Sequence, residues 1–208
     1  MMIELSNRNL YLCVGHRADM ASFLPSVLRG GVDVVQLREK LLPDAQRLAT
    51  ARIMVPICHE FDVPFIVNDS PELAAEAGAD GVHVGQDDVG VAHCRAVLGS
   101  EAIVGLSTHC TEEFEAALDD DATYFSAGPI VATPTKLGRP GTGLAYAVAC
   151  QVRSDRPVFV TGGVDASNVA GLVAAGLSHF VVVRALCDAA DPERAARELR
   201  HALDQALS

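Results

Sequence analysis

Residues 62–88, DVPFIVNDSPELAAEAGADGVHVGQDD, contain one repeat of the pattern that decides the fold. A short apolar run at 64–67 precedes an alanine-rich stretch with helical spacing at 71–77, and a second apolar run follows at 81–84. Gly78 lies where a glycine commonly ends a helix before the next strand. This order of strand, helix and strand predicts a βαβ unit with two parallel strands.

The same alternation continues along the chain and predicts eight strands, each followed by a helix. The predicted strands are 10–14, 34–38, 64–67, 81–84, 103–106, 123–126, 158–160 and 180–183. The predicted helices are 20–29, 44–61, 71–77, 91–98, 112–118, 144–152, 168–175 and 192–207. Eight such units in 208 residues favour an α/β protein with one domain over 1–208, a single-domain (β/α)₈ TIM barrel. A doubly wound sheet of this length would usually have fewer strands.

The composition argues against several classes of protein. The net charge of −11 is unsuited to a general nucleic-acid binder, which needs a basic surface to displace the counterions of the phosphates. The longest apolar runs, such as 63–67 and 180–183, are too short to cross a bilayer, and no signal peptide is expected. Six cysteines are scattered without a Cys-x-x-Cys pair, as expected of reduced thiols in a cytoplasmic protein. A local cluster of basic residues must therefore hold any anionic ligand.

Polar residues gather at the predicted carboxyl ends of the strands, where barrels of this kind carry their active sites. The second strand ends in Gln36, Arg38 and Lys40, which period-two alternation places on one face if the extended backbone continues. An arginine fork and a lysine point charge together suit a diphosphate better than a carboxylate alone. The alternative is a solvated, charged strand end in which the cations pair with Glu39.

Acidic residues follow the third and fourth predicted strands. Asn68 and Asp69 come directly after the third strand, and Asp88 lies shortly after the fourth. Hard oxygen ligands at neighbouring strand ends are what a Mg²⁺ ion that bridges substrate phosphates requires. Each acid alone is equally suited to capping the helix that follows it. Their position beside Arg38 and Lys40 favours the metal site.

Further polar residues follow the fifth and sixth predicted strands. Ser107 is placed either to hydrogen-bond a ligand or to cap the next helix. The connection at 127–143 is unusually long and carries Thr133, Thr135 and Lys136 on a backbone stiffened by prolines. This loop predicts a phosphate clamp that closes over substrate, with a plain flexible connection as the alternative.

The turns after the seventh and eighth strands predict a second anion site. Gly162 and Gly163 follow the seventh strand, and the eighth strand ends in the turn at Val183 and Arg184. Backbone N–H groups at these two turns form the usual phosphate site of such barrels. For Gly162, a tight turn that binds no ligand is an equal alternative.

Taken in order, these motifs resemble those of the thiamine phosphate synthase family, also called thiamine-phosphate pyrophosphorylases. The motifs are Gln36-Leu37-Arg38-Glu39-Lys40, Val67-Asn68-Asp69, His83-Val84-Gly85-Gln86-Asp87-Asp88, Gly105-Leu106-Ser107-Thr108-His109, Gly128-Pro129 with Thr133-Pro134-Thr135-Lys136, and Gly162-Gly163-Val164. The match spans nearly the whole chain. Each motif alone is weak, but six in order at successive strand ends are highly specific.

The resemblance implies a (β/α)₈ barrel that joins a hydroxymethylpyrimidine diphosphate to a thiazole phosphate and releases pyrophosphate, with Mg²⁺ as cofactor. It assigns Gln36, Arg38, Lys40, Asn68 and Lys136 to the pyrimidine diphosphate, Ser107 to the pyrimidine, and Asp69 and Asp88 to Mg²⁺. It assigns Thr133, Thr135, Gly163, Val183 and Arg184 to the thiazole phosphate. Arg38, Lys40 and Lys136 are the expected catalytic residues because they neutralise the charge that builds on the leaving diphosphate.

Two features depart from the family pattern. Arg184 stands where a small serine is expected, and it either adds a cation to the phosphate site or blocks it; we favour the first. The first strand is also less typical of the family, and we assign His16 no role. The alternative functions are a thiazole tautomerase and a non-catalytic sensor of thiazole phosphate. The expected partners are the small-molecule substrates, without nucleic acid or membrane, and a homo-oligomer is compatible with the sequence.

Overall fold

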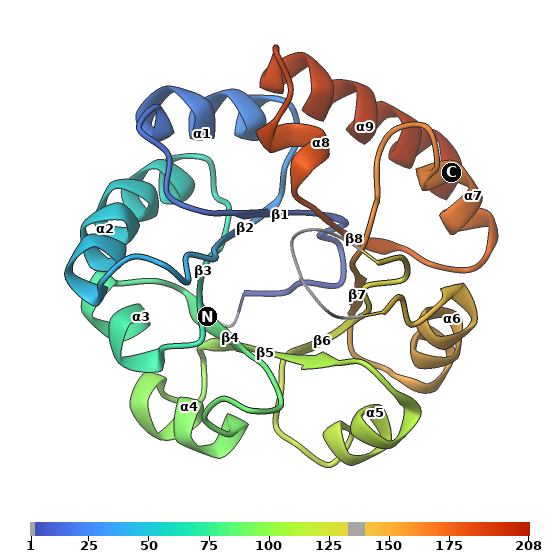
Figure 1. The fold of residues 1–208 in the computed structure, drawn as a ribbon, viewed down its shortest axis with the longest axis horizontal. Helices are drawn as coiled ribbons and strands as arrows, with labels where there is room; N and C mark the ends of the chain where they lie inside the picture. Colours follow the sequence, from blue (N-terminus) through green and yellow to red (C-terminus); the bar gives the residue numbers. More distant parts are fainter. Residues whose placement is uncertain (1–2, 133–139) are drawn as a thin grey trace.

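The chain folds into a closed barrel of eight parallel strands surrounded by helices (Figure 1). The structure is a computed structural model that describes residues 3–132 and 140–208. Within these residues the strands are β1 (Leu10–Val14), β2 (Val34–Leu37), β3 (Phe65–Asn68), β4 (Gly81–Val84), β5 (Ile103–Thr108), β6 (Tyr124–Ala127), β7 (Val158–Val160) and β8 (His179–Val182). Each strand pairs in parallel with the next along the chain, and β8 pairs with β1 to close the barrel.

The helices form a ring outside the strands (Figure 1). They are α1 (Met20–Arg29), α2 (Asp44–Glu60), α3 (Pro71–Ala77), α4 (Val91–Leu98), α5 (Thr111–Ala117), α6 (Leu144–Arg153), α7 (Val169–Ala174), α8 (Arg184–Cys187) and α9 (Pro192–Leu207). Within residues 3–132 and 140–208, no helix combines the length and the apolar character that crossing a membrane requires.

The predicted TIM barrel is confirmed, and most element boundaries differ from the prediction by no more than one residue. The larger difference is β5, which continues to Thr108 because Ser107 and Thr108 still pair with Ser126 and Ala127 of β6. The prediction also missed α8, which begins at Arg184. A four-residue helix is too short to show helical periodicity in the sequence.

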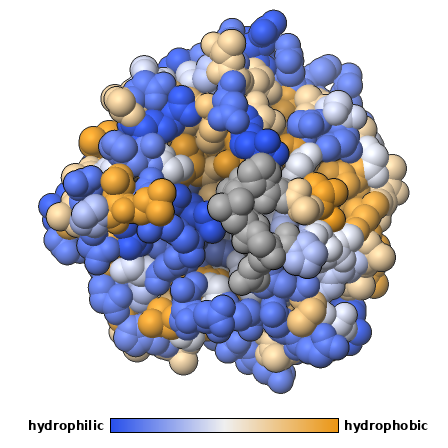
Figure 2. All heavy atoms as spheres, viewed as in Figure 1, coloured by the Kyte–Doolittle hydropathy of each residue, from blue (hydrophilic) through white to orange (hydrophobic). Residues whose placement is uncertain are grey.

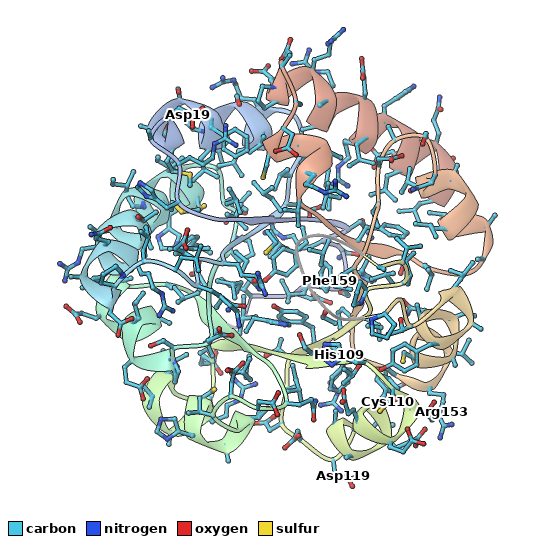
Figure 3. All side chains as sticks on the ribbon, in the orientation of Figure 1. Asp19, His109, Cys110, Asp119, Arg153 and Phe159 are labelled. Atoms are coloured by element: carbon cyan, nitrogen blue, oxygen red, sulfur yellow. The ribbon has the colours of Figure 1, made fainter. Side chains whose placement is uncertain are left out.

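Two separate apolar clusters hold the barrel together. The larger one lies between the strands and the helices. The smaller one fills the barrel and consists of Leu5, Tyr11, Val34, Ile66, Ile103, Tyr124 and Phe159. Phe159 lies near the centre of the barrel in Figure 3, and its ring packs edge-on against Tyr11 and Tyr124, with centroids 5.1 and 5.3 Å away. The rings therefore fix one another's positions beneath the carboxyl ends of the strands.

Candidate active site

A cavity of about 400 Å³ lies inside the carboxyl-terminal half of the barrel. All eight strands or the loops after them contribute to its wall. The lining residues are Tyr11, Cys13, Gln36, Arg38, Asn68, His83, Ser107, Tyr124, Ser126, Pro129, Thr161, Gly162, Gly163, Val164, Asp165, Val181, Val183, Arg184 and Ala185. Hydrophilic residues gather around the centre of the face shown in Figure 2. The cavity has the size and the mixed lining of a small-molecule site.

Two arginines in the cavity wall have no acidic partner. Among the described residues, the guanidinium groups of Arg38 and Arg184 make neither an ion pair nor a hydrogen bond. Every other arginine that the structure describes contacts a carboxylate or a backbone carbonyl. The acid in the wall, Asp165, instead accepts hydrogen bonds from Ser167 in its own turn. Two cations without an acidic partner make this cavity locally positive in a protein of net charge −11, which favours an anionic ligand.

Two buried polar groups in the cavity wall also lack a protein partner within the described part of the chain. These are the side-chain amide nitrogen of Asn68 and the hydroxyl of Thr161. The backbone of Asn68 is held in place, because its carbonyl accepts a hydrogen bond of 3.0 Å from Arg47. Buried polar groups are rarely left unsatisfied in native proteins. Both groups are therefore available to hydrogen-bond a ligand.

The floor of the cavity is a continuous series of side-chain hydrogen bonds, here called the buried hydrogen-bond chain. It consists of Gln36, Tyr11, Tyr124, His83 and Ser107, all less than 8% exposed. The successive donor–acceptor distances are 2.8 Å from Gln36 to Tyr11, 2.9 Å from Tyr11 to Tyr124, 2.9 Å from Tyr124 to His83 and 2.8 Å from His83 to Ser107. This series links Gln36 to Ser107, which the family resemblance assigns to the pyrimidine diphosphate and to the pyrimidine, respectively.

Two carboxylates and a lysine cluster where β3 and β4 end. Lys40 Nζ lies 2.9 Å from Asp69 Oδ2, and Asp88 lies close enough to Asp69 to affect its ionisation. Burial raises the pKa of Asp69, and the carboxylate of Asp88 raises it further, while Lys40 acts in the opposite direction. Asp88 is oriented by a hydrogen bond of 2.8 Å from the backbone N–H of Gly85. Asp69 has a φ of 69°, which is unusual for a residue other than glycine.

This acid pair fits a hard divalent cation. Within residues 3–132 and 140–208, no group of three or more His, Cys, Asp or Glu side chains is arranged to hold a metal. Mg²⁺ keeps several waters and usually takes one or two protein carboxylates together with substrate phosphates. Asp69 and Asp88 provide such a pair, and their mutual repulsion would be relieved by a cation between them.

Glu39 holds the loop that carries Arg38 and Lys40. Its carboxylate accepts hydrogen bonds from the backbone N–H groups of Leu41, at 2.9 Å, and of His16, at 3.1 Å. Burial alone would raise the pKa of Glu39, but these N–H groups lower it below its usual value. Glu39 therefore joins the loops after β1 and β2 instead of neutralising the neighbouring cations.

We expect the replacement of Glu39 by alanine to weaken the binding of inorganic pyrophosphate, in the presence of Mg²⁺, by about tenfold. The variant loses both backbone contacts, so Arg38 and Lys40 are no longer held toward a common ligand. Glu39→Gln keeps one acceptor oxygen and should fall in between. Isothermal titration calorimetry measures the effect, with Glu60→Ala on the exposed end of α2 as the charge-matched control. Equal affinities in Glu39→Ala and Glu60→Ala would contradict this role.

The structure brings most of the predicted site residues together. Gln36, Arg38, Asn68, Ser107, Gly163, Val183 and Arg184 line the cavity. Lys40 does not line it but pairs with Asp69, because β2 ends at Leu37 and the strict alternation is lost. Asp69 and Asp88 lie together as predicted. Thr133, Thr135 and Lys136 lie outside the described residues.

Several cavity residues have no counterpart in the sequence prediction. They are Tyr11, Cys13, Tyr124, Ser126, Thr161 and Asp165. Tyr11 and Cys13, like Tyr124 and Ser126, are two residues apart on one strand, so strand alternation directs each pair inward. That alternation is the signal from which these cavity residues could have been predicted. The sequence does not show, however, which of the two faces of a buried strand points into the barrel.

At the turn after β7, glycine is required by the backbone. Gly162 and Gly163 have φ values of 106° and 72°, in the region that favours glycine. A Cβ on Gly162 would also lie 2.8 Å from the backbone nitrogen of Ile130. The tight-turn interpretation of Gly162 therefore suffices without a ligand. Gly163 has its backbone in the cavity wall, where it is available to an anion.

Together, the barrel and its cavity define an enzyme of the (β/α)₈ class, with a polar cavity at the carboxyl ends of the strands. A family model described as thiamine monophosphate synthase matches residues 10–186. The thiamine-phosphate synthase of Acidothermus cellulolyticus is 42% identical over 203 residues, covering 95% of this chain and 96% of that protein. The thiamine-phosphate synthase of Thermus thermophilus is 45% identical over 177 residues, covering 85% of each chain.

A solved structure shows the same similarity in three dimensions. The thiamine phosphate pyrophosphorylase of Pyrococcus furiosus superposes with a TM-score of 0.87 at 25% identity, covering 97% of this chain and 98% of that one. The chain therefore belongs to the thiamine monophosphate synthase family.

Proposed function

We propose that this protein is a thiamine-phosphate synthase that couples 4-amino-2-methyl-5-hydroxymethylpyrimidine diphosphate to a thiazole phosphate, or its carboxythiazole form, and releases pyrophosphate. The names of its full-length relatives support the synthase activity. The observation that carries the proposal is the pair of unpartnered arginines in one cavity. Arg38 follows β2 and Arg184 follows β8, the two strands that flank β1. Two cations without acids in one cavity suit two anionic groups, as a coupling of two phosphorylated substrates requires.

In this reaction, the bond between the pyrimidine methylene carbon and the diphosphate oxygen breaks, and the thiazole nitrogen attacks the same carbon. The aminopyrimidine ring stabilises the positive charge on the methylene, so a protein nucleophile is not needed. Arg38 and Lys40 would neutralise the negative charge that develops on the leaving diphosphate, together with Lys136. Asn68 would donate its unpartnered amide N–H to the same group.

Asp69 and Asp88 would hold Mg²⁺ beside the diphosphate. The ion, when bound, adds positive charge at the leaving oxygens. The protein's own part is to orient both carboxylates, through Lys40 on Asp69 and the Gly85 N–H on Asp88.

The thiazole phosphate would lie against the turns after β7 and β8. Gly163, Val183 and Arg184 line that side of the cavity. Thr133 and Thr135, from the loop after β6, would complete the phosphate site. Arg184 compensates for a turn that carries no glycine of its own. The alignment of the two rings across one small cavity then supplies much of the rate enhancement, because both reactants are held in contact.

The test is to incubate the purified protein with both substrates and Mg²⁺ and to measure thiamine phosphate and pyrophosphate. Equal amounts of the two products, formed only when both substrates are present, are the expected result. A sensor would bind the substrates without forming pyrophosphate, and a tautomerase would alter the thiazole phosphate alone. Either outcome would refute the synthase proposal. Six free cysteines suit a reducing compartment, so we propose the cytoplasm as the site of activity.

A further inference from the structure

We propose that the buried hydrogen-bond chain fixes the direction of the Ser107 hydroxyl, so that Ser107 donates a hydrogen bond into the cavity, and that Tyr124 and His83 are positioning residues for this donor. The inference rests on the proposed function for the identity of the ligand. Its central feature, the placement of the protons along the chain, is a property of the protein alone.

The proton placement begins at Gln36. The side-chain amide nitrogen of Gln36 donates to the hydroxyl oxygen of Tyr11, and its carbonyl oxygen accepts from Cys13 Sγ at 3.3 Å. An amide nitrogen is only a donor, so the Tyr11 oxygen is the acceptor in this bond. Burial raises the pKa of Tyr11 well above its usual value, so the hydroxyl keeps its proton. That proton is then directed to the other hydroxyl in contact, which belongs to Tyr124.

The direction continues through Tyr124 to His83. Because the Tyr124 oxygen accepts from Tyr11, its own proton points to His83 Nδ1, at 2.9 Å. Burial also raises the pKa of Tyr124, so this proton stays on the phenol. A neutral imidazole that accepts at Nδ1 carries its proton on Nε2.

The last bond of the chain determines what Ser107 offers to a ligand. His83 Nε2 donates to Ser107 Oγ at 2.8 Å, so the serine oxygen is already an acceptor. The hydroxyl proton of Ser107 is then free to point into the cavity that Ser107 lines. Donation in the opposite direction, from Ser107 toward Gln36, would require the side-chain amide of Gln36 to be flipped so that its oxygen faces Tyr11. It would leave Ser107 with a lone pair, and not a proton, for the ligand.

The packing around the chain shows that its central bond is built into the barrel. Gly105 lies beside the contact between His83 and Tyr124, and a Cβ at position 105 would lie 2.4 Å from His83 Nδ1 and from the Tyr124 hydroxyl. The two rings are stacked, with centroids 5.4 Å apart. Phe159 supports the Tyr124 ring from another side. These contacts leave the Tyr124 hydroxyl little freedom to turn away from His83.

A fixed donor at Ser107 sets a requirement on the ligand. The atom that faces Ser107 must be a hydrogen-bond acceptor, such as an unprotonated nitrogen of an aromatic ring, and not the hydrogen of an amino group. The chain thereby selects both the ring and its orientation. It would also hold the methylene carbon toward the thiazole in one position.

Two phenylalanine variants separate this role from a purely structural one. Tyr124→Phe removes the donor to His83 Nδ1 and should raise the KM for the pyrimidine diphosphate by about five- to tenfold, with the KM for thiazole phosphate unchanged. Tyr146→Phe is the matched control, because the Tyr146 hydroxyl has no hydrogen-bond partner among the described residues and lies outside the buried hydrogen-bond chain, and its effect should stay within about twofold. Tyr124→Phe combined with Ser107→Ala should be no worse than Ser107→Ala alone. Additive losses, or equal effects of the two phenylalanine variants, would overturn the proposal.

The decisive readout is the protonation state of His83, measured by ¹⁵N nuclear magnetic resonance of protein with labelled histidine rings. The signal is assigned by its loss in His83→Gln or, if that variant does not fold, as the ring that shifts in both Tyr124→Phe and Ser107→Ala. We expect neutral His83 with its proton on Nε2 in the wild type and in Tyr146→Phe, and loss of this preference in Tyr124→Phe. A proton on Nδ1, or a charged ring, in the wild type would overturn the proposal. This measurement needs no substrate. The proton placement can therefore prove wrong in a protein that has coupling activity, and it can prove right in a protein that has none.

Discussion

Substituting asparagine for Asp69 or for Asp88 is expected to lower kcat by about three orders of magnitude at saturating concentrations of both substrates. Asparagine keeps the size of the side chain but removes the negative charge that a divalent cation requires. The loss should be partly reversed by raising the Mg²⁺ concentration, because binding, and not the fold, is impaired. Steady-state rates measured over a Mg²⁺ titration give the result. Asp87→Asn, on the exposed neighbour of Asp88, is the matched control and should retain the wild-type rate.

Asp69→Asn should not destabilise the protein. Burial raises the pKa of Asp69, so the folded state holds the proton on this carboxyl more tightly than the unfolded state does. In the absence of metal, the contribution of Asp69 to stability is therefore present at low pH. It is lost as the pH rises from about 4, the usual pKa of an aspartate, through the raised value. Asp69→Asn should lack this decline, so that its melting temperature at pH 7 in a chelator equals or exceeds that of the wild type. A lower melting temperature, or unchanged kcat in both asparagine variants, would contradict the assigned role.

The second large effect is expected at Arg38. Arg38→Ala should reduce kcat by about 10²- to 10³-fold, because an uncompensated guanidinium beside the leaving diphosphate acts mainly in the transition state. Arg184→Ser should instead raise the KM for thiazole phosphate by about tenfold and change kcat little, because it removes a cation from the other substrate's phosphate. The kcat and the two KM values of each variant are obtained from initial rates measured with each substrate varied in turn. Arg52→Ala, which breaks an exposed pair with Glu76, is the control.

The two arginine variants are informative as a pair. If Arg38→Ala and Arg184→Ser both raised the KM for the same substrate, the two arginines would bind one substrate. The proposal of two separate anion sites would then be wrong. A lower KM for thiazole phosphate in Arg184→Ser would show that Arg184 hinders binding, which is the alternative that the sequence leaves open.

The barrel was predictable because its determinants are local. Short apolar runs, helical spacing and Gly78 at a helix end are properties of neighbouring residues, and they decide the order of strands and helices. α8 was missed for the same reason, since Arg184–Cys187 is too short to establish a period. Lys40 does not line the cavity beside Arg38, because the extended backbone on which that alternation depends ends with β2 at Leu37.

The candidate site was predictable only in part, because its finer properties arise from tertiary packing. The acids and cations at the strand ends could be identified from their position after each strand. That Arg38 and Arg184 lack acidic partners, whereas the other described arginines are engaged, depends on contacts between distant segments. The buried hydrogen-bond chain depends on the register that sets His83 beside Gly105, and Gly105 beside Tyr124. No local pattern in the sequence contains that register.

The central claim is that two separate anion sites share one cavity. A crystal structure of the protein with thiamine phosphate, pyrophosphate and Mg²⁺ tests it most directly. We expect pyrophosphate within hydrogen-bonding distance of Arg38 and Asn68, and the phosphate of thiamine phosphate against Gly163 and Arg184. Both anions bound at the same arginine, or thiamine phosphate bound outside the cavity, would contradict the account.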